Sequence, residues 1–443
     1  MGGASVSDGG EGTRSPVKIF GNIFISFIGA GVLGLPYAFK EAGVLEGSFI
    51  LIIVGFLSFR GMMLLIKSKQ FCSKTNISRM ELTPPGAREE DQVELLERSR
   101  DSAGQEVNYG DLCQIAYGDR GKNIVDWAII ISQIGFCCAY LIFISENLAH
   151  YYHGLEEGDV VDDTLKLPFL LLMIPGLISL SLVRKLHKLS IFSLFADFAN
   201  VFAYLVVFWF DFEHVSTISI HPKEMDLNGL PFFIGVSIYC YEGAGMILSL
   251  EASVAKDYRS RFSTIFALSI TAMSSLYILF GVCGYLSFGP ETHSIITLNL
   301  PVGPMPLMVK GCLCFSLFFT YPIMLFPVIE ILERRLGTVN HFWKGNLLRA
   351  SVVILSVIVV LIIPDFSTIM VLIGATCCSL LAFILPSLLH MRIFKGRHTR
   401  QQLIEDYVIL IFGCLGTLIG SIDALKRLGI IPGTDFYILS SIL

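Results

Sequence analysis

Charged side chains are scarce in this chain of 443 residues, where 16% of the positions are Asp, Glu, Lys or Arg and 53% are hydrophobic. A soluble globular fold is excluded, because its interior could not hide so much apolar surface. The 32 basic and 37 acidic side chains leave a net charge of −5, which gives no reason to expect a nucleic acid partner. The expected surrounding is a lipid bilayer.

Signatures of enzymes and of disulfide frameworks are also missing. The loops contain no metal-ligand spacing, nucleophile elbow or phosphate-binding loop, so neither an enzyme nor a bound cofactor is expected. Of the eleven cysteines, most fall within apolar segments, and Cys72 and Cys113 lie in a predicted cytosolic loop. They are interpreted as small packing residues. The sequence says nothing about oligomeric state.

Long apolar segments are abundant. About eleven stretches of roughly 20 residues contain few ionisable side chains and are long enough to span a bilayer as helices. They cover residues 17–39, 44–66, 124–150, 167–183, 189–210, 229–250, 262–286, 305–331, 347–363, 367–393 and 404–425. Because these stretches are apolar on every face, they predict helices rather than barrel strands, and the fold class is an all-α polytopic membrane protein.

The distribution of basic residues predicts the orientation. With the N-terminus in the cytosol, the inner loops hold roughly 25 Lys and Arg against about 6 in the outer loops, as the positive-inside rule requires. Residues 1–16 are then a disordered cytosolic segment, and residues 426–443 are a lumenal or extracellular tail. The stretch 67–122 is predicted to be a largely disordered cytosolic loop, whose distal part, 109–117, has the spacing of a surface helix.

Glycine interrupts two of the apolar segments, at residues 29–36 and 242–245. Taken alone, such glycines are typical of close helix packing. Gly29, Gly31 and Gly34 also match a dinucleotide-binding spacing, but a membrane helix cannot supply the strand that this motif needs. Breaks in the first helix of each of two halves favour an inverted-repeat transporter with a binding site near the midplane. The halves would be 17–210 and 229–393, with 404–425 as an extra helix.

Five motifs together resemble the amino acid/auxin permease family, in particular its vacuolar neutral amino acid transporters. They occupy residues 29–39 (GAGVLGLPYAF), 132–148, 189–197, 241–251 (YEGAGMILSLE) and 320–328 (TYPIMLFPV), and the resemblance spans nearly the whole chain. It implies a LeuT-like fold of five plus five helices and a small amino acid bound between the first and sixth helices. The protein would be located in the vacuolar or lysosomal membrane, with the plasma membrane as the alternative.

The resemblance assigns the substrate to the two breaks. The free backbone N–H groups at a half-helix N-terminus attract a carboxylate, and free carbonyl groups opposite receive an ammonium. The expected contacts on the first helix are the backbones of Gly29, Ala30, Gly31 and Val32. The opposing wall and gate are expected from Tyr140, Tyr239, Cys240, Tyr241 and Gly243, although core packing is the more common role for each tyrosine taken singly.

Three ionisable residues, Glu242, Asp197 and Arg60, fall within the apolar segments. Such residues are functional hypotheses because a charge at the bilayer centre costs at least about 2.5 kcal/mol. Glu242 is the first choice for a proton carrier, and its alternative role is to brace the broken helix by hydrogen bonding. Asp197 is interpreted as structural, and Arg60 as snorkelling to the interface.

Sodium is the alternative coupling ion. Sodium-coupled members of the family, as the resemblance implies, have an Asn four residues before the first glycine of the motif, where this sequence has Ile25. An alkyl group cannot ligate a hard cation, so a proton is favoured, while Asn22 and Thr320 keep a sodium site open. The expected function is proton-coupled transport of small neutral amino acids from an acidic lumen to the cytosol. A membrane amino acid sensor with little transport is the main alternative, and a channel is disfavoured.

Overall fold

The computed structural model describes residues 12–81, 107–153, 163–184, 196, 198–210, 223–301, 303–338 and 341–431. Within these ranges the elements are helices, and the β-type pairing is a single isolated bridge between Thr13 and Val254. Nine helices in the described part are long and apolar enough to cross a membrane, or ten if the bent pair at the N-terminus counts as one span. The prediction of an all-α polytopic membrane protein is confirmed.

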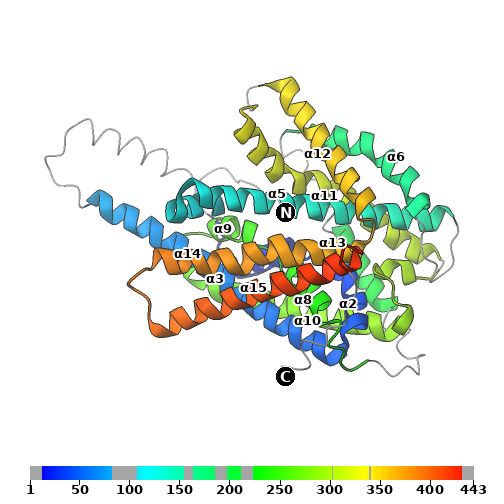
Figure 1. Cartoon of the computed structure of the whole chain (residues 1–443), viewed down its shortest axis with the longest axis horizontal. Helices are drawn as coiled ribbons and strands as arrows, with labels where there is room; N and C mark the ends of the chain where they lie inside the picture. The colour runs from blue at the N-terminus through cyan, green and yellow to red at the C-terminus, as the bar shows by residue number, and fades with distance from the viewer. Residues whose placement is uncertain are drawn as a thin grey trace.

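Helix α5 (Tyr109–Tyr152), the span Phe366–Ile393 and helix α15 (Arg400–Arg427) run along the longest axis of the molecule, whereas α12 (Phe342–Ile362) is steeply inclined to them (Figure 1). In chain order the elements are α1 (Pro16–Phe27), η1 (Ala30–Gly34), α2 (Leu35–Ala42), α3 (Val44–Glu81), α5 (Tyr109–Tyr152), α6 (Asp163–Ser181), α8 (Leu230–Cys240), α9 (Ala244–Ala252), η2 (Arg259–Arg261), α10 (Phe262–Phe288), η3 (Gly289–Glu291), η4 (Ile296–Asn299), α11 (Pro304–Leu336), α12 (Phe342–Ile362), α13 (Phe366–Ile373), η5 (Gly374–Cys378), η6 (Leu380–Ile384), α14 (Leu385–Ile393) and α15 (Arg400–Arg427). A further apolar helix covers Phe198–Phe210.

Two helices extend beyond the apolar segments that predicted them. Helix α3 continues past residue 66 to Glu81, and α5 already begins at Tyr109, so the described parts of the predicted loop 67–122 are helical except for residues 107–108. At Gly118 the backbone of α5 leaves helical geometry, which separates the predicted surface helix 109–117 from the membrane span. Residues 82–106 lie outside the described ranges, as do 1–11, 432–443 and Asp197.

Contacts with other helices explain the extension of α3. Lys69 Nζ donates to the carboxylate of Glu251 on α9, and the Phe71 ring lies 4.5 Å from the Phe394 ring, which follows α14. Hydropathy identifies only the part of a helix that lies within the hydrocarbon core of the membrane. The polar end of α3 is stabilised by partners distant in sequence, which hydropathy does not report.

Both glycine-rich segments are breaks. Helix α1 ends at Phe27, and the chain resumes as η1 and α2 with a bend of 54°. Helix α8 ends at Cys240, and α9 begins at Ala244. Contacts of α8 with η1 and α2 place the two breaks against each other in the interior. Backbone groups freed from helix at this depth are tolerated because they are packed in protein or line a cavity.

Proline and glycine set several helix ends. Pro16, Pro36, Pro231 and Pro304 stand in the first turns of α1, α2, α8 and α11, where a missing N–H is harmless. Gly337 ends α11 in the left-handed conformation, with φ 63°, that glycine adopts without strain. These signals keep the broken segments short and fix where the chain re-enters helix.

The span Phe366–Ile393 contains an irregularity that its hydropathy does not reveal. Between α13 and α14 the hydrogen bonding is of the π type, through η5 and η6. A Cβ added to Gly374 in η5 would collide with the carbonyl oxygen of Gly235 in α8. The wider π turns therefore lie against the broken helix at its point of closest approach, a location typical of functional sites.

Candidate functional site

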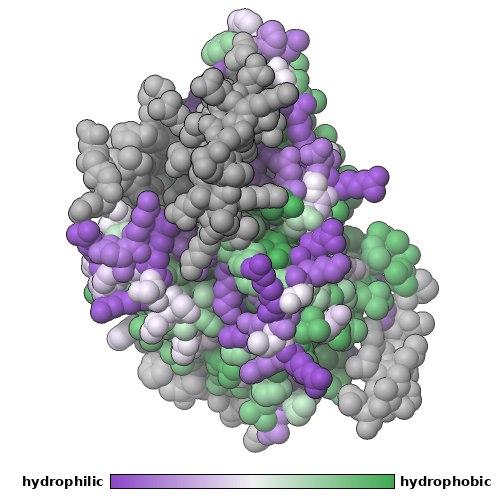
Figure 2. Space-filling model, turned by 90° about the vertical axis from the view of Figure 1, so that its left-hand side faces the viewer, coloured by the Kyte–Doolittle hydropathy of each residue, from purple (hydrophilic) through white to green (hydrophobic). Residues whose placement is uncertain are grey.

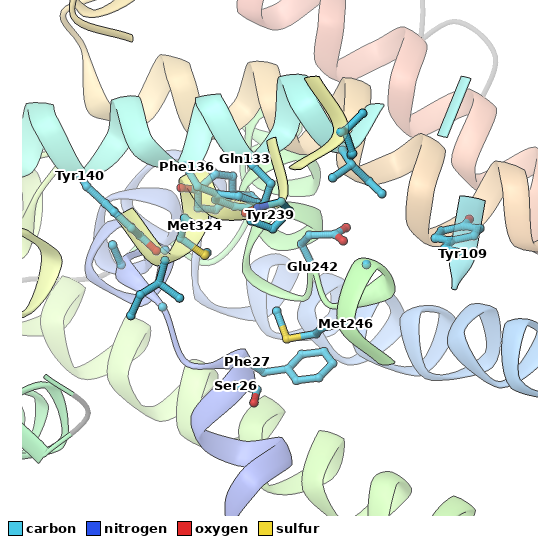
Figure 3. Close-up of a pocket in the computed structure, with 18 of the residues that line it drawn as sticks. Ser26, Phe27, Tyr109, Gln133, Phe136, Tyr140, Tyr239, Glu242, Met246 and Met324 are labelled. Carbon is cyan, nitrogen blue, oxygen red and sulfur yellow. The ribbon is translucent and has the colours of Figure 1, made fainter. Parts of the chain in front are cut away.

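A cavity of about 290 Å³ lies between the two breaks and helices α5, α10 and α11 (Figure 3). Its lining residues are Ser26, Phe27, Gly29, Ala30, Gly31, Val32, Asn108, Tyr109, Gly110, Lys122, Asp126, Ile129, Gln133, Phe136, Tyr140, Tyr239, Cys240, Glu242, Gly245, Met246, Tyr277, Ile323, Met324, Pro327, Glu330, Ile331 and Arg334. Aromatic and thioether side chains make up much of the lining, and its ionisable residues are Lys122, Asp126, Glu242, Glu330 and Arg334. Such a surface suits a small solute with a modest apolar side chain.

The first break presents backbone to the cavity. Gly29, Ala30, Gly31 and Val32 all line it, and the N–H groups that open η1 have no partner within that short helix. A Cβ added to Gly29 would meet nothing within 4 Å, so the space beside its backbone is open. The hydroxyl group of Tyr204, in the helix Phe198–Phe210, donates to the Gly29 carbonyl at 3.1 Å. This hydrogen bond holds the first break against that helix.

Of the three side chains before the second break that were predicted to contact the substrate, two line the cavity and one points away from it. Tyr239 and Cys240 line the cavity, whereas Tyr241 is fully buried and its hydroxyl group lies 2.6 Å from Ser274 Oγ on α10. Gly243 lies directly beneath the Phe27 ring of α1, which an added Cβ would strike. Gly243 therefore provides the close approach between the two broken helices and does not itself line the cavity.

Glu242 stands at the N-terminus of α9 and is half-buried in the cavity wall, between Tyr239 and Met246 (Figure 3). Its carboxyl group accepts hydrogen bonds from the backbone N–H groups of Ala244 and Gly245. Its Oε2 atom is buried and has no hydrogen-bond partner among the described residues. One carboxylate thus occupies the positive end of α9, which leaves the N–H groups of the first break for a different anion.

Tyr277, which the sequence did not single out, links the two breaks. Its hydroxyl group donates to the Phe27 carbonyl at 3.1 Å and lies 3.4 Å from the Cys240 carbonyl. These are carbonyl groups at the ends of α1 and α8 that have no helical partner. Tyr277 is one of several tyrosines on apolar helices, so only the fold distinguishes it from the others.

Further cavity residues also escaped the sequence analysis. Phe136 lies beside Tyr239 with 4.7 Å between ring centroids, and Gln133, one turn earlier on α5, faces the same space. Met246 and Met324 approach from α9 and α11. Helical spacing from Tyr140 reaches Phe136 and Gln133 on one face of α5, and this is the signal that could have identified them.

The cavity opens toward one end of the molecule. Lys122, Asp126, Glu330 and Arg334 line its outer part, at the end where α3 terminates, α5 begins and α14 joins α15 (Figure 1). Hydrophilic residues gather on this face (Figure 2). The basic residues of the α14–α15 connection, Lys395 and Arg397, lie at this end.

The opposite end of the cavity is covered. Buried residues of η4 pack against α5 and η1, and the hydroxyl group of Thr297 donates to Asn147 Oδ1 on α5 at 2.8 Å. Lys40 Nζ on α2 donates to the Thr292 carbonyl at 3.1 Å. The described structure therefore has a cavity accessible from one side only.

The remaining predicted residues lie apart from one another. Tyr140 lines the cavity, whereas Asn22 is exposed on α1 and Thr320 donates to the Ser316 carbonyl of its own helix. Neither Asn22 nor Thr320 lines the cavity. Arg60 forms an ion pair with Glu405 on α15, so its charge has a protein partner at the bundle surface.

Fold and cavity together define a polytopic membrane protein with a central site for a small solute. The family model described as transmembrane amino acid transporter protein matches residues 12–89 and 90–426. The chain therefore belongs to this transporter family, which is not a family of enzymes.

Several characterised relatives align over most of the chain. It is 34% identical over 431 residues to the amino acid transporter AVT3B of Arabidopsis thaliana, with 95% of each chain covered. It is 31% identical to the amino acid transporter ANT1 of the same plant, over 94% of this chain and 95% of the relative. The vacuolar amino acid transporter 3 of Schizosaccharomyces pombe is 28% identical over 83% of this chain and 52% of its own length.

Proposed function

We propose that this protein couples proton movement to the transport of small neutral amino acids from an acidic vacuolar lumen to the cytosol, by alternating access. The observation that carries the proposal is Glu242, whose carboxyl group faces the cavity at a helix break and has one buried oxygen without a partner among the described residues. Burial disfavours the charged form of a carboxyl group, so such a group is suited to take up and release a proton.

The substrate pose follows from the two breaks. The substrate carboxylate lies at the free N–H groups of η1, and its ammonium faces the carbonyl groups at the end of α8. Because Glu242 already occupies the positive end of α9, the two breaks have different roles. The side chain of the bound amino acid then points toward Phe136, Tyr140 and Met324, which offer apolar surface and no formal charge.

The absence of charge near that apolar surface supports a neutral substrate. Apart from Glu242 at the second break, the ionisable lining residues Lys122, Asp126, Glu330 and Arg334 belong to the open end. A cationic or anionic side chain at the inner end would be desolvated opposite uncharged groups, which costs free energy. The vacuolar membrane is proposed because the fungal relative is a vacuolar amino acid transporter.

The proposed direction of transport is supported by the side of the membrane on which the cavity opens. An opening at the basic end corresponds to the cytosolic side, where a substrate carried from the lumen would be released. The LeuT-like repeat of five plus five helices remains part of this proposal, and it is supported by the juxtaposition of α1 with α9 and α2 with α8 around the breaks.

The test is uptake of labelled alanine, leucine, lysine and glutamate into proteoliposomes, with an imposed proton gradient or an imposed sodium gradient. The proposal expects accumulation of alanine or leucine that is driven by protons without sodium and is lost in Glu242→Gln. Glu330→Gln is the matched control, because Glu330 lines the exposed mouth and pairs with Arg334 at 3.2 Å.

Two other results would replace the proposal. Accumulation driven by sodium alone would make the protein a sodium symporter. Binding of an amino acid without transport under either gradient would identify a sensor.

A further inference from the structure

Three potential metal ligands meet where α14 joins α15, away from the amino acid cavity. His390 Nδ1, in the last turn of α14, lies 2.8 Å from Asp406 Oδ2 of α15, and His398 Nδ1, in the connection, lies 4.0 Å from the same oxygen. The ligand atoms of all three residues lie within 4.8 Å of one another. Their side chains are 3%, 11% and 0% exposed for His390, His398 and Asp406, so the cluster is enclosed by protein.

The hydrogen bond on the other side of the His398 ring fixes its tautomer. His398 Nε2 lies 3.0 Å from the Met391 carbonyl oxygen. A carbonyl oxygen can only accept, so Nε2 carries the proton and Nδ1 of the neutral ring presents a lone pair toward Asp406. Both His398 Nδ1 and Asp406 Oδ1 are buried atoms without a hydrogen-bond partner among the described residues.

Acceptor groups therefore face one another with no donor between His398 and Asp406. A buried carboxylate in this position needs a compensating cation. Within the described ranges no Lys or Arg forms a salt bridge with Asp406, although Lys67 on α3 interacts with it electrostatically at longer range. A divalent cation would satisfy both unpartnered atoms at once.

We propose that His390, His398 and Asp406 bind a Zn²⁺ ion that joins α14 to α15 at the basic end of the molecule. Imidazole nitrogen and carboxylate oxygen are ordinary zinc ligands, at about 2.0 to 2.2 Å from the metal. In a tetrahedral site, ligand atoms at such distances are about 3.3 Å apart. The separations of 2.8 and 4.0 Å lie on either side of this value, so small side-chain shifts create the site.

Binding also accounts for the remaining hydrogen bonds. A neutral His390 that ligates through Nδ1 carries its proton on Nε2, so the metal replaces the hydrogen bond to Asp406 through a change of tautomer, with no net release of a proton. The bond from His398 Nε2 to Met391 becomes the outer contact that orients a ligating imidazole. Water takes the fourth position. The three ligands span only residues 390–406, so the ion closes a short connection between two spanning helices.

The experiment uses the full-length protein in detergent, with any affinity tag removed. The protein is incubated with Zn²⁺, desalted and analysed for bound metal by mass spectrometry, and its thermal unfolding is followed with zinc or with a chelator. We expect one Zn²⁺ per chain and a lower melting temperature in chelator, since a ligand that binds only the folded state stabilises it. Co²⁺ in place of zinc should give the visible spectrum of a tetrahedral site.

Two variants make the test specific. His398→Gln removes a ligand from the connection, where the side chain is least buried, and is expected to weaken zinc binding at least about tenfold. His341→Gln is the matched control, because His341 is an exposed histidine that precedes α12 and gives its helix no side-chain cap. It should keep the full metal content.

Metal content well below one per chain, or equal loss in both histidine variants, would overturn the proposal. So would a melting temperature that changes between pH 5 and 7 but does not respond to zinc. That outcome would mean that a proton on His398 supplies the compensating charge.

Discussion

Gly243 and Phe27 show how single residues hold the two broken helices together. The Phe27 ring, at the end of α1, covers Gly243, at the start of α9, and leaves no space for a Cβ atom. Gly245, two residues later, has nothing within 4 Å of its own added Cβ. The two glycines of one motif therefore have different requirements, which the sequence pattern alone does not reveal.

This difference gives a matched pair of substitutions. Gly243→Ala should push the Phe27 ring away, destabilise the protein by about 1 to 3 kcal/mol and reduce uptake at least tenfold. Gly245→Ala should leave stability equal or slightly higher, because alanine favours a helix over glycine by up to about 1 kcal/mol. Thermal unfolding and proteoliposome uptake measure both. Equal effects of the two changes would contradict the packing account.

At the scale of elements, α9 depends on α3 for its position. Lys69 Nζ on α3 lies 3.0 Å from Glu251 Oε2 at the end of α9 and 3.2 Å from the Leu248 carbonyl. The side chain of Glu251 is 1% exposed and that of Lys69 is 11% exposed, so solvent screens this pair weakly. Arg259, with Nε 3.9 Å from Glu251 Oε1, adds a third charge from the segment that follows α9.

A double-mutant cycle measures this connection. Glu251→Gln alone should cost about 3 to 5 kcal/mol, because it leaves the Lys69 ammonium buried without its counter-charge. Lys69→Met combined with Glu251→Gln should cost less than the sum of the single changes, with a coupling free energy of about 0.5 to 3 kcal/mol. Denaturant titration in mixed micelles gives the values. Strict additivity would show that the pair does not hold α9 against α3.

The sequence predicted the spanning helices and both breaks because these depend on local chemistry. Apolar length marks a membrane span, and closely spaced glycines within it mark an interrupted one. The π-type turns of η5 and η6, the bridging hydroxyl group of Tyr277 and the His390–Asp406 contact depend on partners far along the chain or in space. Such contacts have no local pattern, so they appear only in the folded structure.

Side-chain direction limited the prediction of the cavity in the same way. Tyr239 and Tyr241 are two residues apart at the end of α8, and the motif gave no reason to separate them. In the structure Tyr239 faces the cavity, while Tyr241 turns toward Ser274 on α10. Which tyrosine meets the cavity is decided by where α8 stops being helical.

For the whole molecule, access from one side defines the described conformation. Gln133 lies on the cavity wall between the breaks and the charged mouth. In vesicles of known orientation, Gln133→Cys should react with a membrane-impermeant thiol reagent added on the side of the N-terminus, and a transported amino acid should slow the reaction. The control is the parent chain, whose Cys240 also lines the cavity but is buried. Faster labelling from the opposite side would contradict the assigned orientation.

The most direct test of the central claim compares net uptake with exchange in Glu242→Gln. If Glu242 carries the proton, the amide variant mimics the protonated state, so it should lose accumulation driven by a proton gradient but still exchange external labelled amino acid for internal unlabelled amino acid. Retained exchange with lost accumulation is the result that the account predicts. Loss of both in a variant that unfolds at the same temperature as the parent, or retention of both, would contradict a proton-carrying role for Glu242.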